Sequence, residues 1–127
     1  MKFSEMPYAR PDIDATLALC ASLAKKAAAA ASGEELVALY FEQSRALADY
    51  NTAETLASIH CSCDTRDDFW REEQDFFDKN GPAVANASTD IYRAILANPY
   101  VDALTEAFGS TCVPGMRNAV LAVDERF

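Results

Sequence analysis

The stretch that decides the fold is EELVALYFEQSRALADYNTAETLASIHCSC, residues 34–63, which contains neither proline nor glycine. Large and small apolar side chains recur along it at helical spacing, at Leu36, Tyr40, Leu47, Tyr50 and Ala57. Steps of three, four or seven residues place side chains on one face of an α-helix. The stretch therefore predicts a single long amphipathic helix over about residues 34–63.

A shorter helix is predicted before it, over residues 12–31. Pro11 and Asp12 open this helix, because proline suits the first turn and an aspartate side chain accepts a free amide hydrogen there. The sequence Ser32-Gly33-Glu34-Glu35 then combines a glycine stop with a capping box. In that motif Ser32 caps the following helix and Glu35 reaches back to the preceding backbone.

The sequence DTRD, residues 64–67, predicts a break after the long helix and a new helix start. Asp64 or Thr65 is expected to be the capping residue. The negative charges of Asp67 and Asp68 are expected to stabilise the helix, because they lie near its positive N-terminal end. Two aromatic pairs spaced by seven residues follow, and this spacing predicts two buried rows on the next helix. The pairs are Phe69 with Phe76 and Trp70 with Phe77.

Proline and glycine divide the rest of the chain. Gly81-Pro82 predicts a kink or a fresh helix that continues to about Ala97. Asn98-Pro99 then opens a short helix, which Gly109 ends. Val113-Pro114-Gly115 precedes a last helix from Met116. No alternating apolar pattern indicates a strand. The sequence predicts an all-α fold, an antiparallel helical bundle of about five to six helices in a single domain, residues 1–127.

Composition and charge exclude several classes of function. The chain has 127 residues, of which half are hydrophobic and only four are glycine, as expected for a packed globular protein. Its formal net charge is −9, and the basic residues form no cluster beyond Lys25-Lys26. Nucleic acids and anionic membrane surfaces need a concentrated basic face, so neither is an expected partner. The N-terminus has no apolar signal segment, and we expect a cytoplasmic protein.

The four cysteines are Cys20, Cys61, Cys63 and Cys112. In the absence of a secretion signal they are expected to be reduced thiols. Cys20 and Cys112 lie among apolar residues, where cysteine behaves as a small hydrophobic residue. A disulfide framework is not predicted.

The most polar stretch is SIHCSCDTRDDFW, residues 58–70, which holds the single histidine of the chain. His60, Cys63, Asp64 and Asp67 share one helical face, so this spacing allows a metal site with three or four ligands. Cys61 and Cys63 point to nearly opposite sides of a helix and cannot both face one ion. No second half of a zinc site is present elsewhere, which favours a solvated helix end with capping aspartates.

A catalytic site is not predicted from the residues either. A nucleophilic cysteine with His60 as its base would need an oxyanion site, which an adjacent pair on one helical turn does not provide. A general acid–base pair could come from four acids that are more simply the solvated face of their helix: Glu72, Glu73, Asp75 and Asp78. We therefore assign no catalytic, cofactor-binding or metal-binding residue.

One further hypothesis concerns the charged residues around the predicted break. Arg10 precedes the first helix, and Asp64 and Asp67 follow the long one. These three residue types could form a buried charged network that ties the N-terminal segment to the helix junction.

Three blocks of sequence together resemble one family. They are FSEMPYARPD at 3–12, TLASIHCSCDTRDDFWREEQDFFDKNGP at 55–82, and IYRAILANPYVDALTEAFG at 91–109. The chain resembles the amino-terminal portion of oligoendopeptidase F and the thimet-oligopeptidase-like zinc metallopeptidases. The resemblance rests on these residues: Tyr8, Arg10, Pro11, Asp12, Leu56 to Ile59, Asp64, Thr65, Asp67, Phe69, Trp70, Phe76, Phe77, Asp78, Gly81 and Pro82. The family usually has a basic residue where this chain has His60, and Cys61 and Cys63 look like local substitutions.

The resemblance implies hydrolysis of short peptides by a zinc-bound water. That chemistry uses two histidines and a glutamate in the order His-Glu-x-x-His, and this chain has one histidine. The implied role is a truncated, non-catalytic amino-terminal lobe that forms part of the wall of the substrate channel. Zinc and the catalytic domain would belong to the remainder of the parent chain.

Two alternatives to this role remain open at the level of sequence. One is a stand-alone helical interaction or oligomerisation module without enzymatic activity, which keeps the lobe and lacks the enzyme. The other is a thiol or metal sensor built on His60, Cys61 and Cys63. For the truncated lobe itself, the apolar C-terminal run AVLAVDERF, residues 119–127, could pair with a second copy, which makes a homodimer of the isolated fragment an expected possibility.

Overall fold

The computed structural model describes residues 5–64 and 66–126, with the backbone alone at 126. Within these residues the chain forms six helices and no strand. The helices are α1 (Ile13–Ala29), α2 (Gly33–Ala46), α3 (Ala48–Cys63), α4 (Asp68–Ala97), α5 (Asp102–Phe108) and α6 (Cys112–Arg126). The predicted all-α bundle of about five to six helices is confirmed. None of these helices is long and apolar enough to cross a membrane.

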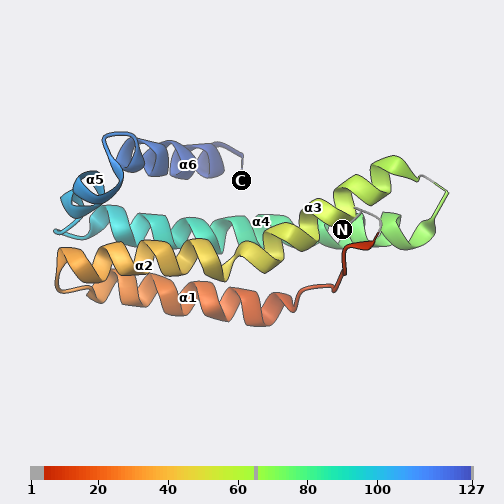
Figure 1. Cartoon of the computed structure of the whole chain (residues 1–127), viewed down its shortest axis with the longest axis horizontal. Coiled ribbons are helices and arrows are strands. Elements are labelled where there is room, and N and C mark those ends of the chain that lie inside the picture. Colours follow the sequence, from red (N-terminus) through yellow and green to blue (C-terminus); the bar gives the residue numbers. More distant parts are fainter. Residues whose placement is uncertain (1–4, 65, 127) are drawn as a thin grey trace.

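The helices lie side by side along one long axis (Figure 1). The α2–α3 pair runs antiparallel to both α1 and α4, and α6 returns along α4 in the opposite direction. α4 is the central element, because it contacts α1, α3 and α6. The short α5 lies across one end of the bundle, where it contacts α2 and α6.

The predicted helix starts at Asp12 and Ser32 are confirmed, whereas the start predicted at Asn98-Pro99 is wrong, because Asn98 is the C-cap of α4 and α5 begins only at Asp102. The side chain of Asp12 accepts a hydrogen bond from the Ala15 amide at 3.1 Å, and Ser32 Oγ accepts one from the Glu35 amide at 3.1 Å. Glu35 reaches back to the Ala31 amide at 2.8 Å, which completes the capping box. Gly33 is the first residue of α2 rather than a stop alone. A Cβ at this position would lie 2.7 Å from the Cβ of Ala103, so glycine allows α5 to approach α2.

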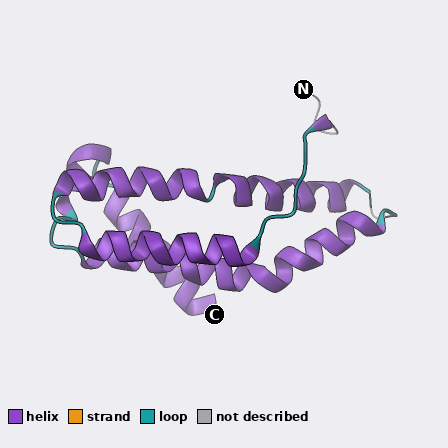
Figure 2. Cartoon of the chain, turned by 90° about the horizontal axis from the view of Figure 1, so that it is seen from below, coloured by secondary structure: helices purple, strands orange, loops and turns teal. Residues whose placement is uncertain are grey.

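The predicted long helix over 34–63 is helical except at one residue, Leu47, which separates α2 from α3. Leu47 has φ −95° and ψ 0°, and its amide still donates to the Gln43 carbonyl at 3.4 Å. This dihedral combination turns the chain slightly while the Leu47 side chain stays in the core. Figure 2 shows α2 and α3 end to end with a short break between them.

The predicted interruption at Gly81-Pro82 gives no fresh helix, because α4 continues through Pro82 from Asp68 to Ala97. A proline removes one helical hydrogen bond, here to the carbonyl of Asp78 four residues earlier. Asp78 is on the exposed side of α4, where water can replace the missing donor. Burial of Phe77, Val84 and the isoleucines farther along α4 offsets the cost of about 3 kcal/mol.

The last helix also differs from the prediction, since α6 begins at Cys112 rather than Met116. Pro114 therefore lies in the first turn, where an amide hydrogen would have no helical acceptor, and the proline costs little. Gly109 ends α5 with φ +96°, as its position predicted.

The core has two parts. The larger cluster joins α1, α2, α4, α5 and α6 through residues that include Cys20, Leu23, Leu36, Ile91 and Ile95. The smaller cluster joins α3 to the first half of α4 through Tyr50, Ala53, Ala57, Phe77 and Val84. All four cysteines are free thiols, and burial raises the pKa of Cys20.

The prediction that both aromatic rows of α4 are buried is wrong for one row. Phe77 is in the core and Trp70 is half-buried, but Phe69 is 50% exposed. Phe76, seven residues later in the same row, is half-buried against the smaller core cluster, because positions seven apart rotate by about 20° around the helix.

A buried asparagine fixes the corner where α4 ends. Asn98 donates through Nδ2 to the carbonyls of Ala27 (2.9 Å) and Ala30 (3.1 Å) at the end of α1. Its Oδ1 accepts from the Tyr100 amide at 2.8 Å. One side chain therefore satisfies two carbonyls that α1 itself leaves without donors and one amide of the following turn.

We predict that Asn98→Ala lowers the free energy of unfolding by about 2–4 kcal/mol, because it leaves buried carbonyls unsatisfied. Urea unfolding followed by circular dichroism measures this loss. Asn86→Ala, at an exposed position of α4, is the matched control and should change stability by less than about 0.5 kcal/mol. Equal effects of the two substitutions would contradict the role given to Asn98.

Candidate functional site

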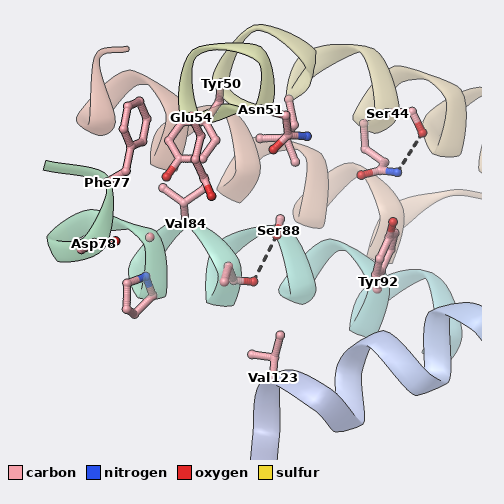
Figure 3. A pocket seen from close by; sticks show the side chains of 15 residues that line it. Ser44, Tyr50, Asn51, Glu54, Phe77, Asp78, Val84, Ser88, Tyr92 and Val123 are labelled. Carbon is pink, nitrogen blue, oxygen red and sulfur yellow. Dashed lines mark hydrogen bonds between the residues drawn. The ribbon is translucent and has the colours of Figure 1, made fainter. Parts of the chain in front are cut away.

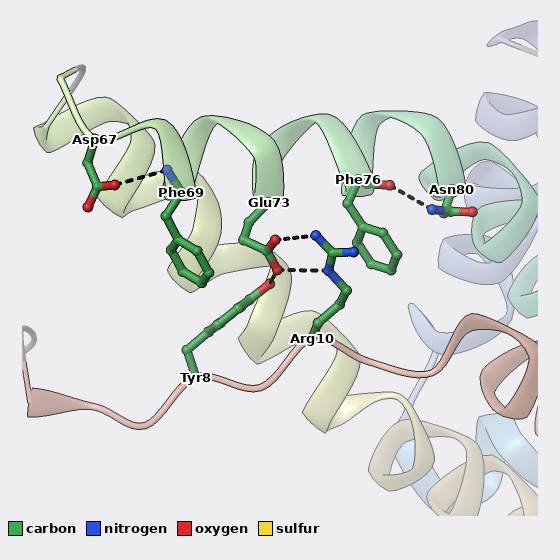
Figure 4. Close-up of polar contacts among 7 residues, drawn as sticks. All are labelled: Tyr8, Arg10, Asp67, Phe69, Glu73, Phe76 and Asn80. Atoms are coloured by element: carbon green, nitrogen blue, oxygen red, sulfur yellow. Dashed lines mark hydrogen bonds and ion pairs between the residues drawn. The ribbon is translucent and has the colours of Figure 1, made fainter.

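The N-terminal segment, residues 5–12, crosses the start of α4 and is held there by a buried glutamate (Figure 4). Arg10 binds both carboxylate oxygens of Glu73: Nε donates to Oε1 at 3.0 Å and Nη2 pairs with Oε2. The Tyr8 hydroxyl donates to the same Oε1 at 2.6 Å. We call Tyr8, Arg10 and Glu73 the N-terminal clamp.

Glu73 is 3% exposed, so its charge depends on these partners. The hydrogen bond from Arg10 lowers the pKa of Glu73, burial acts in the opposite direction, and the bond from Tyr8 lowers it further. The net direction is downward, which keeps Glu73 ionised. Burial and the adjacent carboxylate raise the pKa of Tyr8, so the phenol stays protonated and donates.

Aromatic rings surround the clamp and connect it to the end of α3. The Arg10 guanidinium lies over the ring of Phe76, 4.4 Å from its centroid. The ring of Tyr8 meets Trp70 edge to face at 5.0 Å, and Trp70 stacks on His60 with centroids 4.1 Å apart. The N-terminal segment, the end of α3 and the start of α4 therefore pack as one unit.

The predicted network of Arg10 with Asp64 and Asp67 is wrong. Asp64 pairs with Arg66 and accepts from the Arg66 amide, whereas Asp67 caps α4 by accepting from the Phe69 amide at 2.9 Å. The capping residue is thus Asp67 rather than Asp64, and Thr65, the other predicted cap, lies outside the described residues. Both aspartates are exposed and serve the local turn.

The partner of Arg10 is Glu73. The sequence pattern predicts this residue on the solvated face of its helix, because it is one of a run of acids. The other three acids of that set, Glu72, Asp75 and Asp78, are exposed as expected. A usable signal was present in the sequence. Glu73 follows Trp70 by three residues and precedes Phe77 by four, which places it on the buried stripe.

The metal-ligand set that the spacing allowed is not brought together. Across residues 5–64 and 66–126 no three His, Cys, Asp or Glu side chains are grouped closely enough to hold a metal ion. His60 stacks on Trp70, Cys61 is half-buried and Cys63 is exposed. The end of α3 therefore packs against the clamp, and these residues do not fit a zinc ion.

A groove of about 720 Å³ lies between α2, α3, α4 and α6 (Figure 3). Tyr50 and Gln43 are buried in it, and the carboxylates of Glu54 and Asp78 lie at its edges. Sequence reasoning missed this site, because Tyr50 belongs to an ordinary apolar stripe and Asp78 to a run of acids. Only the packing of α3 against α4 brings them to one groove.

The polar lining of the groove includes two serines. Its two serines return hydrogen bonds to their own helices: Ser44 donates to the Tyr40 carbonyl at 3.2 Å and Ser88 to the Ala85 carbonyl at 3.1 Å. No histidine, cysteine or lysine is among its lining residues.

We predict that Glu73→Gln lowers the free energy of unfolding by about 1–2 kcal/mol at neutral pH, because Arg10 is half exposed and its charge can return to water. The folded-state pKa of Glu73 lies below its unfolded value. The contribution of the clamp is therefore present above the ordinary glutamate pKa of about 4.3 and is lost as pH falls through the folded-state pKa.

Urea unfolding of both proteins at a series of pH values measures this effect. The difference between the native chain and Glu73→Gln should be constant near neutral pH and shrink at acidic pH. Glu106→Gln removes an exposed carboxylate on α5 and serves as the control, with little change expected. A difference for Glu73→Gln that is the same at every pH would count against the clamp.

The comparisons with known proteins agree with this architecture. The sequence model of the family described as Peptidase M3 N-terminal domain matches residues 3–123. PZ peptidase A, solved with inhibitor 2, is 29% identical with a TM-score of 0.88, and a structure assigned as an oligoendopeptidase F is 30% identical with a TM-score of 0.88.

Each of these alignments covers 94% of this chain and 21% of the solved chain, so the chain spans about a fifth of the length of these relatives. No curated protein sequence matches significantly. The resemblance to the amino-terminal portion of oligoendopeptidase F is confirmed by the family match and by both structures. The chain belongs to the M3 peptidase family and has the fold of that family's N-terminal domain.

Proposed function

We propose that residues 1–127 form the non-catalytic amino-terminal domain of a zinc-dependent oligopeptidase that hydrolyses short peptides in the cytoplasm. In the full enzyme this domain forms part of the wall of the substrate channel. The observation that carries the proposal is the match of nearly the whole chain to the N-terminal domain of M3 peptidases, at a TM-score of 0.88 to two peptidases.

The catalytic chemistry is assigned to the remaining domain of the parent chain. A zinc peptidase needs two histidines one helical turn apart with a glutamate base between them, and this chain has a single histidine that stacks on Trp70. Zinc, when bound, supplies an activated water in that other domain. Residues of this chain contribute shape, charge and rigidity.

The described residues support a wall-forming role. The N-terminal clamp fixes the N-terminal segment on α4, and Asn98 fixes the opposite end of the bundle to α1. Arg93 ties α6 to α4 through Asp124, with Nη2 and Oδ1 2.5 Å apart. A channel wall held at both ends and along its length keeps its shape while peptides pass it.

We predict that the purified chain cleaves no short peptide, with or without added zinc, and retains no stoichiometric zinc after purification without chelator. A fluorogenic peptide assay and metal analysis measure these two properties. An intact M3 peptidase under the same conditions is the positive control. Peptide cleavage that copurifies with the 127-residue chain would overturn the proposal.

A second role, a helical interaction module, is favoured by one observation. Phe41 is 54% exposed beside an apolar hollow that also includes Val37, Ala38, Ala103 and Ala107, on the joint surface of α2 and α5. We infer that this surface contacts the catalytic domain in the parent protein. In the isolated chain the same surface is available to a second copy.

We predict that light scattering finds a homodimer of the isolated chain at high concentration and that Phe41→Ser shifts it toward monomer, because the substitution removes the largest exposed apolar side chain of this surface. Leu121→Ser changes an equally exposed position on α6, within the run 119–127 that the sequence suggested as a contact, and should leave the mass unchanged. A homodimer that responds to Leu121→Ser instead would place the contact on α6.

A further inference from the structure

The groove between α2, α3, α4 and α6 is rich in hydrogen-bond acceptors and has no basic residue in its lining. Glu54 projects into it from α3, and Asp78 lies across from it on α4 (Figure 3). Asn51, on the same face of α3 as Glu54, adds an amide oxygen. Two carboxylates at the edges of a concave site attract a cation, because the low-dielectric walls concentrate their field.

The floor of the groove contains a polar atom without a regular hydrogen bond. Tyr50 is 5% exposed, and its hydroxyl makes no hydrogen bond of normal length and angle within the described residues, although the Glu54 carboxylate lies close enough to interact with it. Burial, together with the nearby carboxylate of Glu54, raises the pKa of Tyr50 to about 12. The hydroxyl is therefore neutral at physiological pH, and its oxygen is available to accept a hydrogen bond from a ligand.

Gln43 adds a second buried acceptor on the α2 side of the groove. Its Nε2 donates to Ser44 Oγ at 3.1 Å, which orients the amide and fixes the position of Oε1. Acceptors thus line the groove at its floor and at both edges. A ligand that complements them carries several donors and a positive charge.

We propose that this groove binds the side chain of an arginine in a short peptide. The guanidinium group has five donors in a planar fork and keeps its charge in a partly buried site, whereas a lysine ammonium has three donors at a single point. The groove volume of about 720 Å³ accommodates the side chain with adjoining peptide backbone. The peptide as the source of the arginine rests on the proposed function, whereas the preference for a cation rests on the groove itself.

The test is an NMR titration of the 127-residue chain with the peptide N-acetyl-Ala-Arg-Ala-amide. The matched probe is the same peptide with citrulline, which keeps the shape of arginine and lacks its charge. We expect the arginine peptide to shift the amide resonances of residues that line the groove, and to bind at least about tenfold more tightly than the citrulline peptide.

Three variants assign the contacts. Glu54→Gln and Asp78→Asn should each weaken binding of the arginine peptide by about three- to tenfold, and Tyr50→Phe should weaken it by a similar factor while its ring still packs on Phe77. Asp49→Asn, an exposed position of α3 outside the groove, removes the same charge and should leave binding unchanged.

Three results would overturn the inference. Equal binding of the citrulline and arginine peptides would show peptide affinity without recognition of the charge, which leaves the proposed function standing. Resonance shifts confined to residues outside the groove, or no shifts with either peptide, would remove the groove as the site. The proposed function fails separately, through peptide cleavage by the chain itself.

Discussion

A buried carboxylate, that of Glu73, is the constraint on which the start of the bundle depends. An unpaired charge in a protein interior costs several kcal/mol, so α4 can bury this residue only where a cation and further donors meet it. Arg10 and Tyr8 supply them from the N-terminal segment, 63 and 65 residues away in sequence. These contacts therefore fix where the N-terminal segment crosses α4. Trp70 packs against Tyr8 and Phe76 against Arg10, so that Glu73 is buried while Arg10 stays half exposed.

The same interaction determines the surroundings of the polar end of α3. The ring of His60 is stacked on Trp70, whose ring also meets those of Tyr8 and Phe69, so the histidine belongs to the packing around the clamp. The aspartates that follow it bond to backbone amides of the turn and of α4. Residues that are close in sequence here thus make separate local contacts and do not converge on one site. Proximity in sequence on a helix does not by itself produce a site, because neighbouring side chains diverge by about 100° per residue.

The polar groups of this M3 peptidase family domain fall into two kinds, those that hold the bundle together and those that line the groove. The ends and the long sides of the bundle are held by specific hydrogen bonds, through the clamp, Asn98 and Arg93. The groove in the middle has the opposite character: its buried hydroxyl makes no regular hydrogen bond and its edges carry negative charge. Satisfied polar groups stabilise a scaffold, whereas an unsatisfied one in a concave site is available to a ligand.

The sequence by itself determined the helical class and most of the helix ends, because Asp12, Ser32, Glu35 and Gly109 act within a few residues of their own position. It also carried the family resemblance and excluded a zinc site of the His-Glu-x-x-His type. Tertiary structure decided the break at Leu47, the passage of α4 through Pro82, the choice of Glu73 over Asp64 and Asp67 as the partner of Arg10, and the groove. These features depend on energies of burial and pairing between residues far apart in the chain, which local periodicity and capping do not contain.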